Sequence, residues 1–192
     1  MPTLRLFISI DTPPKIKSLI SRVISKIKET GADVKWEPPE KLHATIKFLG
    51  NADEGLVGRI ASVLEEICVR QDGIDVRYAN LGCFPERGQP RVIWIGIEDR
   101  ADALKRLNDS IEDVMATIGF SREERKFTPH LTIGRVKGRK NLHRLLTRME
   151  TITFESEPVV IGELALMKSE LGPGGSVYTT LKLIPFGNRA PG

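Results

Sequence analysis

The segment His43-Ala44-Thr45-Ile46-Lys47-Phe48 is matched, 87 residues further along the chain, by His130-Leu131-Thr132-Ile133-Gly134-Arg135. Both segments contain alternating polar and apolar residues, which is typical of a strand with one buried face. In each segment the histidine and the threonine two residues later project to the same face, because side chains alternate across a strand. The sequence therefore predicts two equivalent strands that each present an imidazole and a hydroxyl.

The repeat extends well beyond these two strands. Apolar residues alternate over 4–10 and again over 91–97, and each of these predicted strands precedes an amphipathic helix, at 16–27 and 104–118. Both halves then continue with a further helix and closing strands, predicted as helices at 57–68 and 142–149, strands at 75–84, 159–168 and 177–184, and a turn at 172–175. We therefore interpret the chain as an internal duplication with approximate halves 1–86 and 87–187.

This order of elements predicts an α+β fold in a single bilobal domain, 1–192. The two lobes are expected to be pseudo-symmetric, and each is expected to be a mostly antiparallel sheet with helices on its outer face. A groove between the lobes is the natural place for a functional site. We expect the two imidazoles and the two hydroxyls to face this groove and to meet at the repeat axis.

The composition excludes several classes of protein. Of the 192 residues, 40% are hydrophobic and 28% are charged, and no apolar run approaches the ~20 residues that cross a bilayer, so a membrane span and wholesale disorder are excluded. The first residues lack a signal-peptide pattern, and we expect a cytoplasmic protein. The spacing of Cys68 and Cys83 predicts neither a disulfide framework nor a zinc ribbon. The net charge of +4 fits an anionic partner, and it fits a solvated mixed-charge surface equally well.

Paired imidazoles are suited to proton transfer at a phosphodiester. A neutral imidazole removes a proton from the attacking oxygen, an imidazolium donates one to the leaving oxygen, and neither step requires a metal. The hydroxyls of Thr45 and Thr132 would donate hydrogen bonds to the non-bridging phosphate oxygens. By pseudo-symmetry, either His43 or His130 could be the acid. The alternative is a non-catalytic protein that retains both motifs after duplication, and His143, which has no repeat partner, is expected to be a solvated surface residue.

At these two motifs the sequence resembles the two-histidine (2H) phosphoesterase superfamily. It is most similar to the RNA 2′,3′-cyclic phosphodiesterase branch, historically called 2′-5′ RNA ligase. The resemblance covers nearly the whole chain and includes the segments 5–10, 81–85, 90–94 and 127–135. It implies a bilobal α+β fold with a V-shaped groove.

The resemblance also implies an activity: the metal-independent opening of a terminal RNA 2′,3′-cyclic phosphate to a 2′-phosphomonoester, without a cofactor. Members of the family also join RNA halves through a 2′-5′ linkage. In the family the first histidine is taken as the proton donor to the leaving 3′ oxygen and the second as the base that activates water. These are His43 and His130 in this sequence.

Four further residues are candidates for substrate binding. Arg135 matches a family arginine and would pair with phosphate if a bulge at Gly134 turned it toward the groove, whereas in a regular strand it would form a salt bridge on the outer face. Phe7 and Trp94, equivalent in the repeat, would line the groove and stack on a base, or serve as ordinary packing. Lys47 shares the face of the first motif's catalytic pair and would reach a flanking phosphate, or remain a surface lysine.

We therefore expect a monomeric enzyme that acts on RNA with a 2′,3′-cyclic phosphate end. Two alternatives stay open: a related activity on small cyclic nucleotides or 2′-5′ oligonucleotides, and a non-catalytic module that binds RNA or a nucleotide. A metallophosphodiesterase is disfavoured and no metal site is predicted, because no cluster of Asp and His residues has the spacing of metal ligands.

Overall fold

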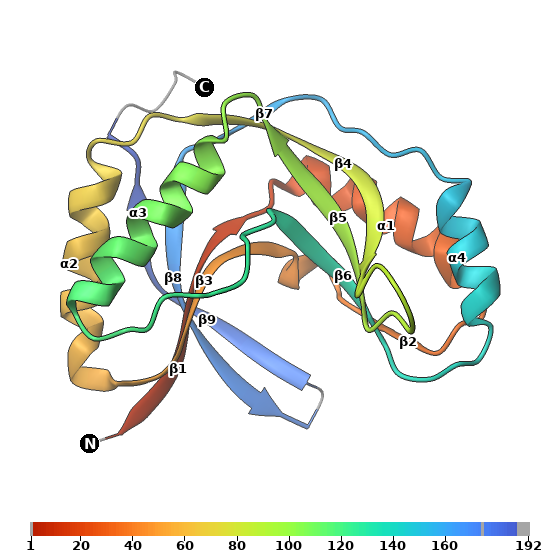
Figure 1. The fold of residues 1–192 in the computed structure, drawn as a ribbon, viewed down its shortest axis with the longest axis horizontal. Coiled ribbons are helices and arrows are strands. Elements are labelled where there is room, and N and C mark those ends of the chain that lie inside the picture. Colours follow the sequence, from red (N-terminus) through yellow and green to blue (C-terminus); the bar gives the residue numbers. More distant parts are fainter. Residues whose placement is uncertain (1, 174, 188–192) are drawn as a thin grey trace.

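The protein folds into one curled sheet of nine strands with α-helices packed on it, in a computed structural model that describes residues 2–173 and 175–187 (Figure 1). Its strands are β1 (Thr3–Asp11), β2 (Val34–Trp36), β3 (His43–Asp53), β4 (Ile74–Phe84), β5 (Val92–Asp99), β6 (His130–Val136), β7 (Val159–Ile161), β8 (Glu163–Gly172) and β9 (Gly175–Pro185). Its helices are α1 (Pro14–Lys28), α2 (Val57–Cys68), α3 (Ala103–Thr117) and α4 (Leu142–Glu150), with short 3-10 helices at Pro39–Lys41 and Glu54–Leu56. The predicted α+β class is confirmed. Gly174, inside the predicted turn, lies outside the described residues.

The paired strands of the sheet run antiparallel, in the order β7-β4-β5-β6-β3-β1-β8-β9, and β2 pairs with β6. The strands form two lobes, which meet where β3 lies beside β6 (Figure 1). In the described part of the chain, the ladder between β3 and β6 consists of one residue pair, Ala44 with Leu131. We call this junction the seam. It passes between the central residues of the two predicted motifs.

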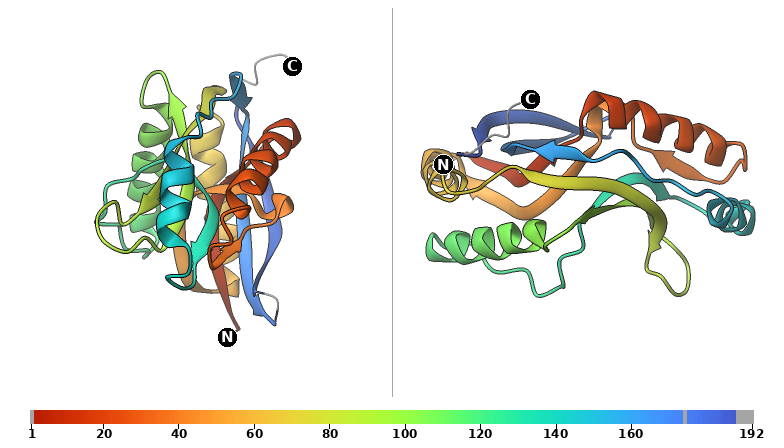
Figure 2. Two further views of the ribbon diagram at one scale, coloured as in Figure 1. Left: turned by 90° about the vertical axis from the view of Figure 1, so that its right-hand side faces the viewer. Right: turned by 90° about the horizontal axis from the view of Figure 1, so that it is seen from above.

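The two lobes do not coincide with the two halves of the sequence. Strand β4, from the first half, pairs with β5 and β7 from the second, whereas β8, from the second half, pairs with β1 from the first. The helices are exchanged as well, since α1 packs beside α4 and α2 packs beside α3 (Figure 2). Each lobe is therefore built from both halves, because a closing strand of each half completes the sheet of the other.

The repeated apolar positions form the core of the protein. Equivalent residues of β1 and β5 are all buried, namely Leu6, Ile8, Ile10, Ile93, Ile95 and Ile97. Helix α1 illustrates how the sequence contributes to this core: Pro14 occupies a first-turn position, where proline is tolerated, and apolar residues at helical spacing face inward. The basic residues Lys26 and Lys28 in its last turn are favourable beside the helix C-terminus. The duplicated pattern thus produces one shared core.

Each motif strand contains a bulge at the same repeat position. The register between β1 and β3 skips Ile46, and the register between β5 and β6 skips Ile133. A bulge inserts one residue and reverses the alternation of side chains beyond it. The residue three positions after each motif threonine, Phe48 in β3 and Arg135 in β6, is therefore turned to the face that carries the motif.

Candidate active site

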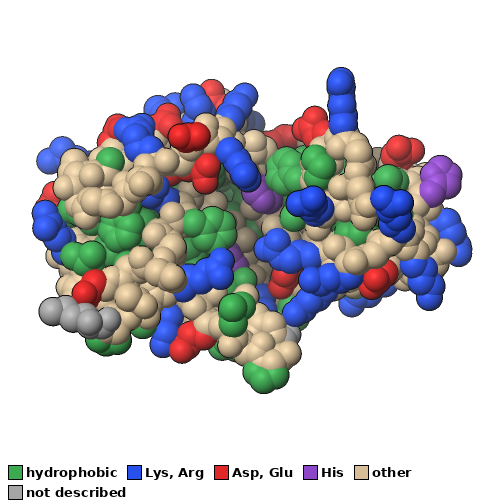
Figure 3. Space-filling view, turned by 60° about the horizontal axis from the view of Figure 1, so that its bottom comes forward, with side chains coloured by type: hydrophobic (Ala, Val, Ile, Leu, Met, Phe, Trp, Pro, Cys, Tyr) green, Lys and Arg blue, Asp and Glu red, His purple; other side chains and the backbone are tan. Residues whose placement is uncertain are grey.

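The seam brings His43, Thr45, His130 and Thr132 together. The central residues of the two motifs pair with each other and are buried, so the flanking histidine and threonine side chains project to the opposite face. Because the strands are antiparallel, each histidine lies toward the threonine of the other motif. All four residues are half-buried. Figure 3 shows histidine side chains in a hollow between the two lobes, with Lys and Arg side chains on its rim.

Both imidazoles are held by the same backbone contact. The Nδ1–H of His43 donates to the carbonyl oxygen of Lys41 at 2.7 Å, and the Nδ1–H of His130 donates to that of Thr128, also at 2.7 Å. These two carbonyls occupy equivalent repeat positions. Each contact fixes the ring so that Nε2 is the atom left for chemistry, as an acceptor in neutral imidazole and as a donor in imidazolium.

Aromatic rings pack against both histidines. The ring centroid of His43 lies 5.0 Å from that of Phe7 and 4.9 Å from that of Tyr178, and the ring of His130 meets Phe84 edge to face at 5.1 Å. Tyr178 and Phe84 were not among the predicted site residues. Tyr178 has no partner in the repeat that would have indicated its role, whereas Phe84 lies in the segment 81–85 that carries the family resemblance.

Burial and local charge act differently on the two imidazoles. Desolvation lowers the pKa of both His43 and His130 below the usual value. Near His43, the carboxylates of Asp11 and Glu37 oppose this decrease of the pKa because they stabilise imidazolium. Near His130, the guanidinium of Arg135 lowers the pKa further because like charges repel. The charged neighbours therefore differ: Asp11 and Glu37 stabilise imidazolium at His43, partly opposed by Lys17, whereas Arg135 disfavours imidazolium at His130.

The two motif threonines have free hydroxyl groups. Thr45 and Thr132 are half-buried, and neither Oγ1 forms a hydrogen bond to another of the described residues. Each hydroxyl is fixed to a sheet position and points to the face that carries the imidazoles. Such a hydroxyl is available to donate to an oxygen atom of a bound ligand without first breaking an internal contact.

The bulges place an arginine and an aromatic ring at equivalent positions beside the motifs. Arg135 is 49% exposed and forms an ion pair with Glu37, with Nε 3.6 Å from Oε1. The predicted salt bridge forms, but not on the outer face, because the bulge turns this side chain to the face of Thr132. Phe48 is 63% exposed and its ring centroid lies 6.0 Å from that of Phe7. Regular alternation along the strand would place Phe48 on the buried side, opposite His43 and Thr45. The 87-residue offset from Arg135 is the signal that could have identified its role.

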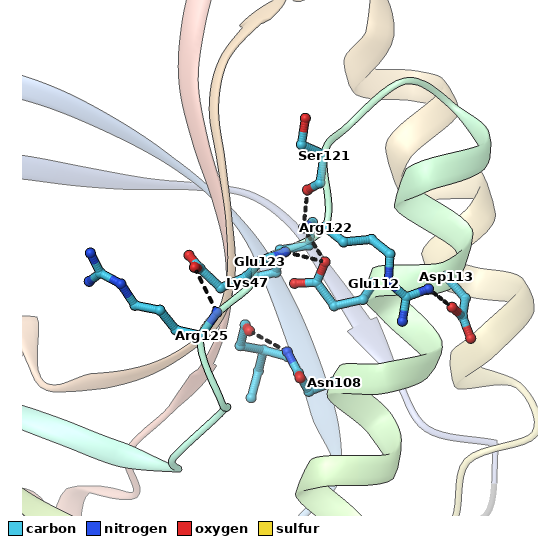
Figure 4. Close-up of polar contacts among 9 residues, drawn as sticks. Lys47, Asn108, Glu112, Asp113, Ser121, Arg122, Glu123 and Arg125 are labelled. Carbon is cyan, nitrogen blue, oxygen red and sulfur yellow. Dashed lines mark hydrogen bonds and ion pairs between the residues drawn. The ribbon is translucent and has the colours of Figure 1, made fainter.

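The expectation that Lys47 reaches a flanking phosphate is wrong. The bulge turns Lys47 away from the motif and toward α3, where its side chain is only 2% exposed. Its Nζ lies 2.5 Å from Oε2 of Glu112 and donates a hydrogen bond to the carbonyl oxygen of Ser121 (Figure 4). The ammonium group is therefore occupied within the protein and does not face the hollow.

The two aromatic candidates differ in accessibility. Phe7 lies on the motif face but is 1% exposed, since the rings of His43, Phe48 and Tyr178 surround it. Its predicted stacking on a base is therefore wrong, and Phe7 instead supports the imidazole. Trp94 is half-buried, and its indole lies over a glycine, Gly82, where an added Cβ would lie 2.1 Å from the ring.

Other observations bear on the remaining predictions. His143 is exposed on α4, as predicted for a histidine without a repeat partner. Within residues 2–173 and 175–187, no three His, Cys, Asp or Glu side chains are grouped so that they could hold a metal ion. No helix in the same part of the chain is long and apolar enough to cross a bilayer.

Comparison with known proteins identifies the family. Residues 16–173 match the 2′-5′ RNA ligase superfamily. The chain belongs to this superfamily. Relatives named RNA 2′,3′-cyclic phosphodiesterase include a protein of Methanothermobacter thermautotrophicus, 33% identical over 93% of this chain and 97% of the relative, and one of Methanocaldococcus jannaschii, 35% identical over 93% of this chain and 99% of the relative. The predicted resemblance is thus confirmed.

Solved structures of low sequence identity share the superfamily's fold. The protein TT0787 of Thermus thermophilus superimposes with a TM-score of 0.82 at 23% identity, over 96% of this chain and 99% of that protein. LigT of E. coli, crystallised with 3′-AMP, superimposes with a TM-score of 0.76 at 23% identity and the same coverage. The fold is therefore shared over almost the whole length of the chain.

Proposed function

We propose that this chain is a metal-independent phosphodiesterase that opens terminal 2′,3′-cyclic phosphates of cytoplasmic RNA to 2′-phosphomonoesters. The observation that supports this most directly is the pair of imidazoles at the seam, each held through Nδ1 with Nε2 free. Two such groups provide a general acid and a general base at one phosphate. The relatives named RNA 2′,3′-cyclic phosphodiesterase support RNA as the substrate.

We assign the base to His130 and the acid to His43. Nε2 of His130 removes a proton from water as the water oxygen bonds to phosphorus, and Nε2 of His43 gives a proton to O3′ as the bond between phosphorus and O3′ breaks. The product is a 2′-phosphomonoester with a free 3′-hydroxyl. The charges support this assignment, because carboxylates beside His43 stabilise its protonated form while Arg135 disfavours protonation of His130.

Five other side chains complete the proposed site. The hydroxyls of Thr45 and Thr132 donate to the non-bridging phosphate oxygens, where negative charge increases in the transition state. Arg135, on the same face, adds a positive charge near the phosphate. Phe48 presents an exposed ring on that face and takes the base-stacking role that was predicted for Phe7, and Trp94 of β5, in the other lobe, provides a second ring.

The same chemistry extends to ligation. If the 5′-hydroxyl of a second RNA replaces water, its oxygen bonds to phosphorus, O3′ leaves, and the product contains a 2′-5′ linkage. Both proton transfers are unchanged. Because one chain supplies both imidazoles and both hydroxyls, we propose that the monomer is the active unit.

The test is an assay on a short RNA with a 2′,3′-cyclic phosphate end, run with and without EDTA beside 2′,3′-cyclic AMP. We expect turnover of the RNA in EDTA, and ³¹P NMR should identify a terminal 2′-phosphate. A 3′-phosphate product, or loss of activity on chelation that zinc restores, would contradict the proposal. Turnover of 2′,3′-cyclic AMP without turnover of the RNA would favour the small-nucleotide alternative.

A further inference from the structure

The two lobes hold the chain beside their motif strands in different ways. Strand β2 pairs with β6, and the N–H of Glu37, just after β2, donates to the carbonyl oxygen of Ile133, the bulge residue, at 3.0 Å. The segment at the repeat position of β2 is 121–123, and it is not a strand. The carbonyl oxygen of the other bulge residue, Ile46, accepts instead from the side-chain amide of Asn108 on α3 at 2.9 Å.

Side chains replace the missing ladder beside β3. Glu112, one turn after Asn108 on α3, forms a buried ion pair with Lys47, in which the two side chains are 7% and 2% exposed. Lys47 Nζ also donates to the carbonyl oxygen of Ser121 at 2.9 Å, and the N–H of Glu123 donates to Oε2 of Glu112 at 3.1 Å. Figure 4 shows these contacts converging between β3, α3 and the segment 121–123. We call Lys47, Asn108 and Glu112 the brace.

The brace connects the segments that carry the two motifs. Lys47 lies two residues after Thr45, and the segment 121–123 leads directly to the carbonyl of Thr128 that orients His130. Within the described residues, the ladder between β3 and β6 consists of the one residue pair at the seam. A ladder of one pair leaves the relative rotation of two strands poorly fixed, so the brace supplies a second point of attachment.

A buried ion pair contributes little net stability to a folded protein. Moving two charges out of water costs much of what their attraction returns, and apolar side chains of similar volume stabilise such a position equally well or better. What apolar side chains cannot supply is the set of directed hydrogen bonds to the bulge and to the segment 121–123. The polar side chains of the brace are therefore suited to fixing the relative positions of β3, α3 and the segment 121–123.

We infer that Lys47, Asn108 and Glu112 are positioning residues, which hold the first motif and the approach to the second at the spacing that proton transfer across the phosphate requires. This inference rests on the proposed phosphodiesterase function. Misplacement of one imidazole by a fraction of an ångström to an ångström lowers turnover sharply, because acid and base must reach the same phosphate together. Substrate affinity, which depends on Phe48 and Arg135, should change much less.

The decisive variant is the double substitution Lys47→Met/Glu112→Leu, which replaces the ion pair with apolar side chains. We expect its thermal unfolding temperature to stay close to that of the wild type, while kcat on cyclic-phosphate RNA falls by ~10- to 10²-fold and KM changes little. The matched control is Arg77→Gln/Glu155→Gln, which removes an ion pair that is exposed and contacts neither motif. The control should leave both kcat and the unfolding temperature unchanged.

A readout independent of turnover is the NMR signal of each imidazole Cε1–H. In the folded double variant we expect the signals of His43 and His130 to shift, while that of His143 on α4 stays in place. If the wild type does not open the cyclic phosphate, the proposed function fails, and this readout still tests the brace. A folded double variant with wild-type kcat and unmoved signals would overturn the inference.

Asn108→Ala covers the case in which the double variant does not fold. It removes only the hydrogen bond to the carbonyl oxygen of Ile46 and leaves the ion pair in place. We expect a folded protein with kcat reduced by a few-fold to ~10-fold and an unchanged KM. Wild-type kcat in this variant, with both imidazole signals unmoved, would show that the brace is structural only and would overturn the inference.

Discussion

The His43 segment and the His130 segment occupy equivalent positions in the repeat, yet their surroundings have diverged. Both imidazoles donate through Nδ1 to the carbonyl two residues earlier, and both strands bulge one residue after the threonine. Around His43 lie two carboxylates and two aromatic rings, whereas Arg135 and Phe84 lie around His130. The contacts at one equivalent position differ as well: β6 pairs with β2 there, whereas β3 is contacted by the side chains of the brace.

This difference shows how a symmetric site acquires an asymmetric task. The two motifs supply equivalent groups, but the proposed hydrolysis needs one imidazole charged and the other neutral at the same moment. Opposite charges on neighbouring side chains are the ordinary means of separating two such groups. In this protein the charges of opposite sign nearest to the two imidazoles come from residues outside the motifs, Asp11 near His43 and Arg135 near His130.

The largest expected effect tests whether both motifs are needed. His43→Ala and His130→Ala should each reduce turnover by ~10²- to 10⁴-fold, the usual contribution of a positioned general acid or base. Steady-state kinetics on cyclic-phosphate RNA measure this loss. His143→Ala is the control and should be fully active, because its side chain is exposed on α4. Near-normal turnover in either motif variant would show that one imidazole suffices.

The threonines should give the next largest effect, and an equivalent one in both motifs. Thr45→Val and Thr132→Val should each reduce kcat by ~10- to 10³-fold if both hydroxyls donate to phosphate oxygens. The unfolding temperature should barely change, because valine keeps the β-branched shape that suits a strand. Thr179→Val, at an exposed position of β9, is the control. A loss confined to one threonine would mean that the phosphate sits in one lobe only.

Charge substitutions should shift the two imidazoles in opposite directions. Arg135→Met removes a positive charge and should raise the pKa of His130, whereas Asp11→Asn removes a negative charge and should lower the pKa of His43. NMR titration of the imidazole Cε1–H signals measures both, with His143 as an internal reference. Shifts in the same direction would remove the electrostatic reason for assigning acid and base.

The smallest effect concerns stability and pH. Because burial lowers the pKa of His43 and of His130 from 6.5, the unfolded chain binds more protons than the folded protein around and below that pH. Stability should therefore be complete well above pH 6.5, decrease as the pH falls from about 6.5 toward the lower folded-state pKa values, and change no further from this cause below them. Denaturant unfolding at several pH values measures this slope. The double variant His43→Gln/His130→Gln should show a smaller slope, and an unchanged slope would contradict the cause given.

The lowered pKa values of His43 and His130 also predict the pH at which kcat/KM is highest. One imidazole must be neutral and the other protonated, so the profile should be bell-shaped. Since both pKa values lie below 6.5, the maximum should also lie below pH 6.5 in the free enzyme. A rate that rises to a plateau at alkaline pH would show that no protonated imidazole takes part.

The features that could be predicted from the sequence are mainly those that occur at equivalent positions in both repeats. The histidines and threonines could be found because alternation and the 87-residue offset depend only on local chain geometry. Lys47 was misplaced because a bulge at Ile46 leaves no clear local signal, although its equivalent beside Gly134 was anticipated. The ring contact of Tyr178 and the exchange of strands between lobes depend on long-range pairing, which alternation within one strand does not specify.

The exchange of closing strands has a consequence for any half of this molecule. A chain cut between residues 86 and 87 yields two fragments that each hold one motif histidine, and each lacks the strands that its partner supplies to its sheet. A single ancestral repeat with this topology would bury its edges by associating with a copy of itself about a two-fold axis through the seam. In such a dimer, acid and base would come from different molecules, and catalysis would depend on protein concentration. Fusion of the two copies into one chain removes that dependence.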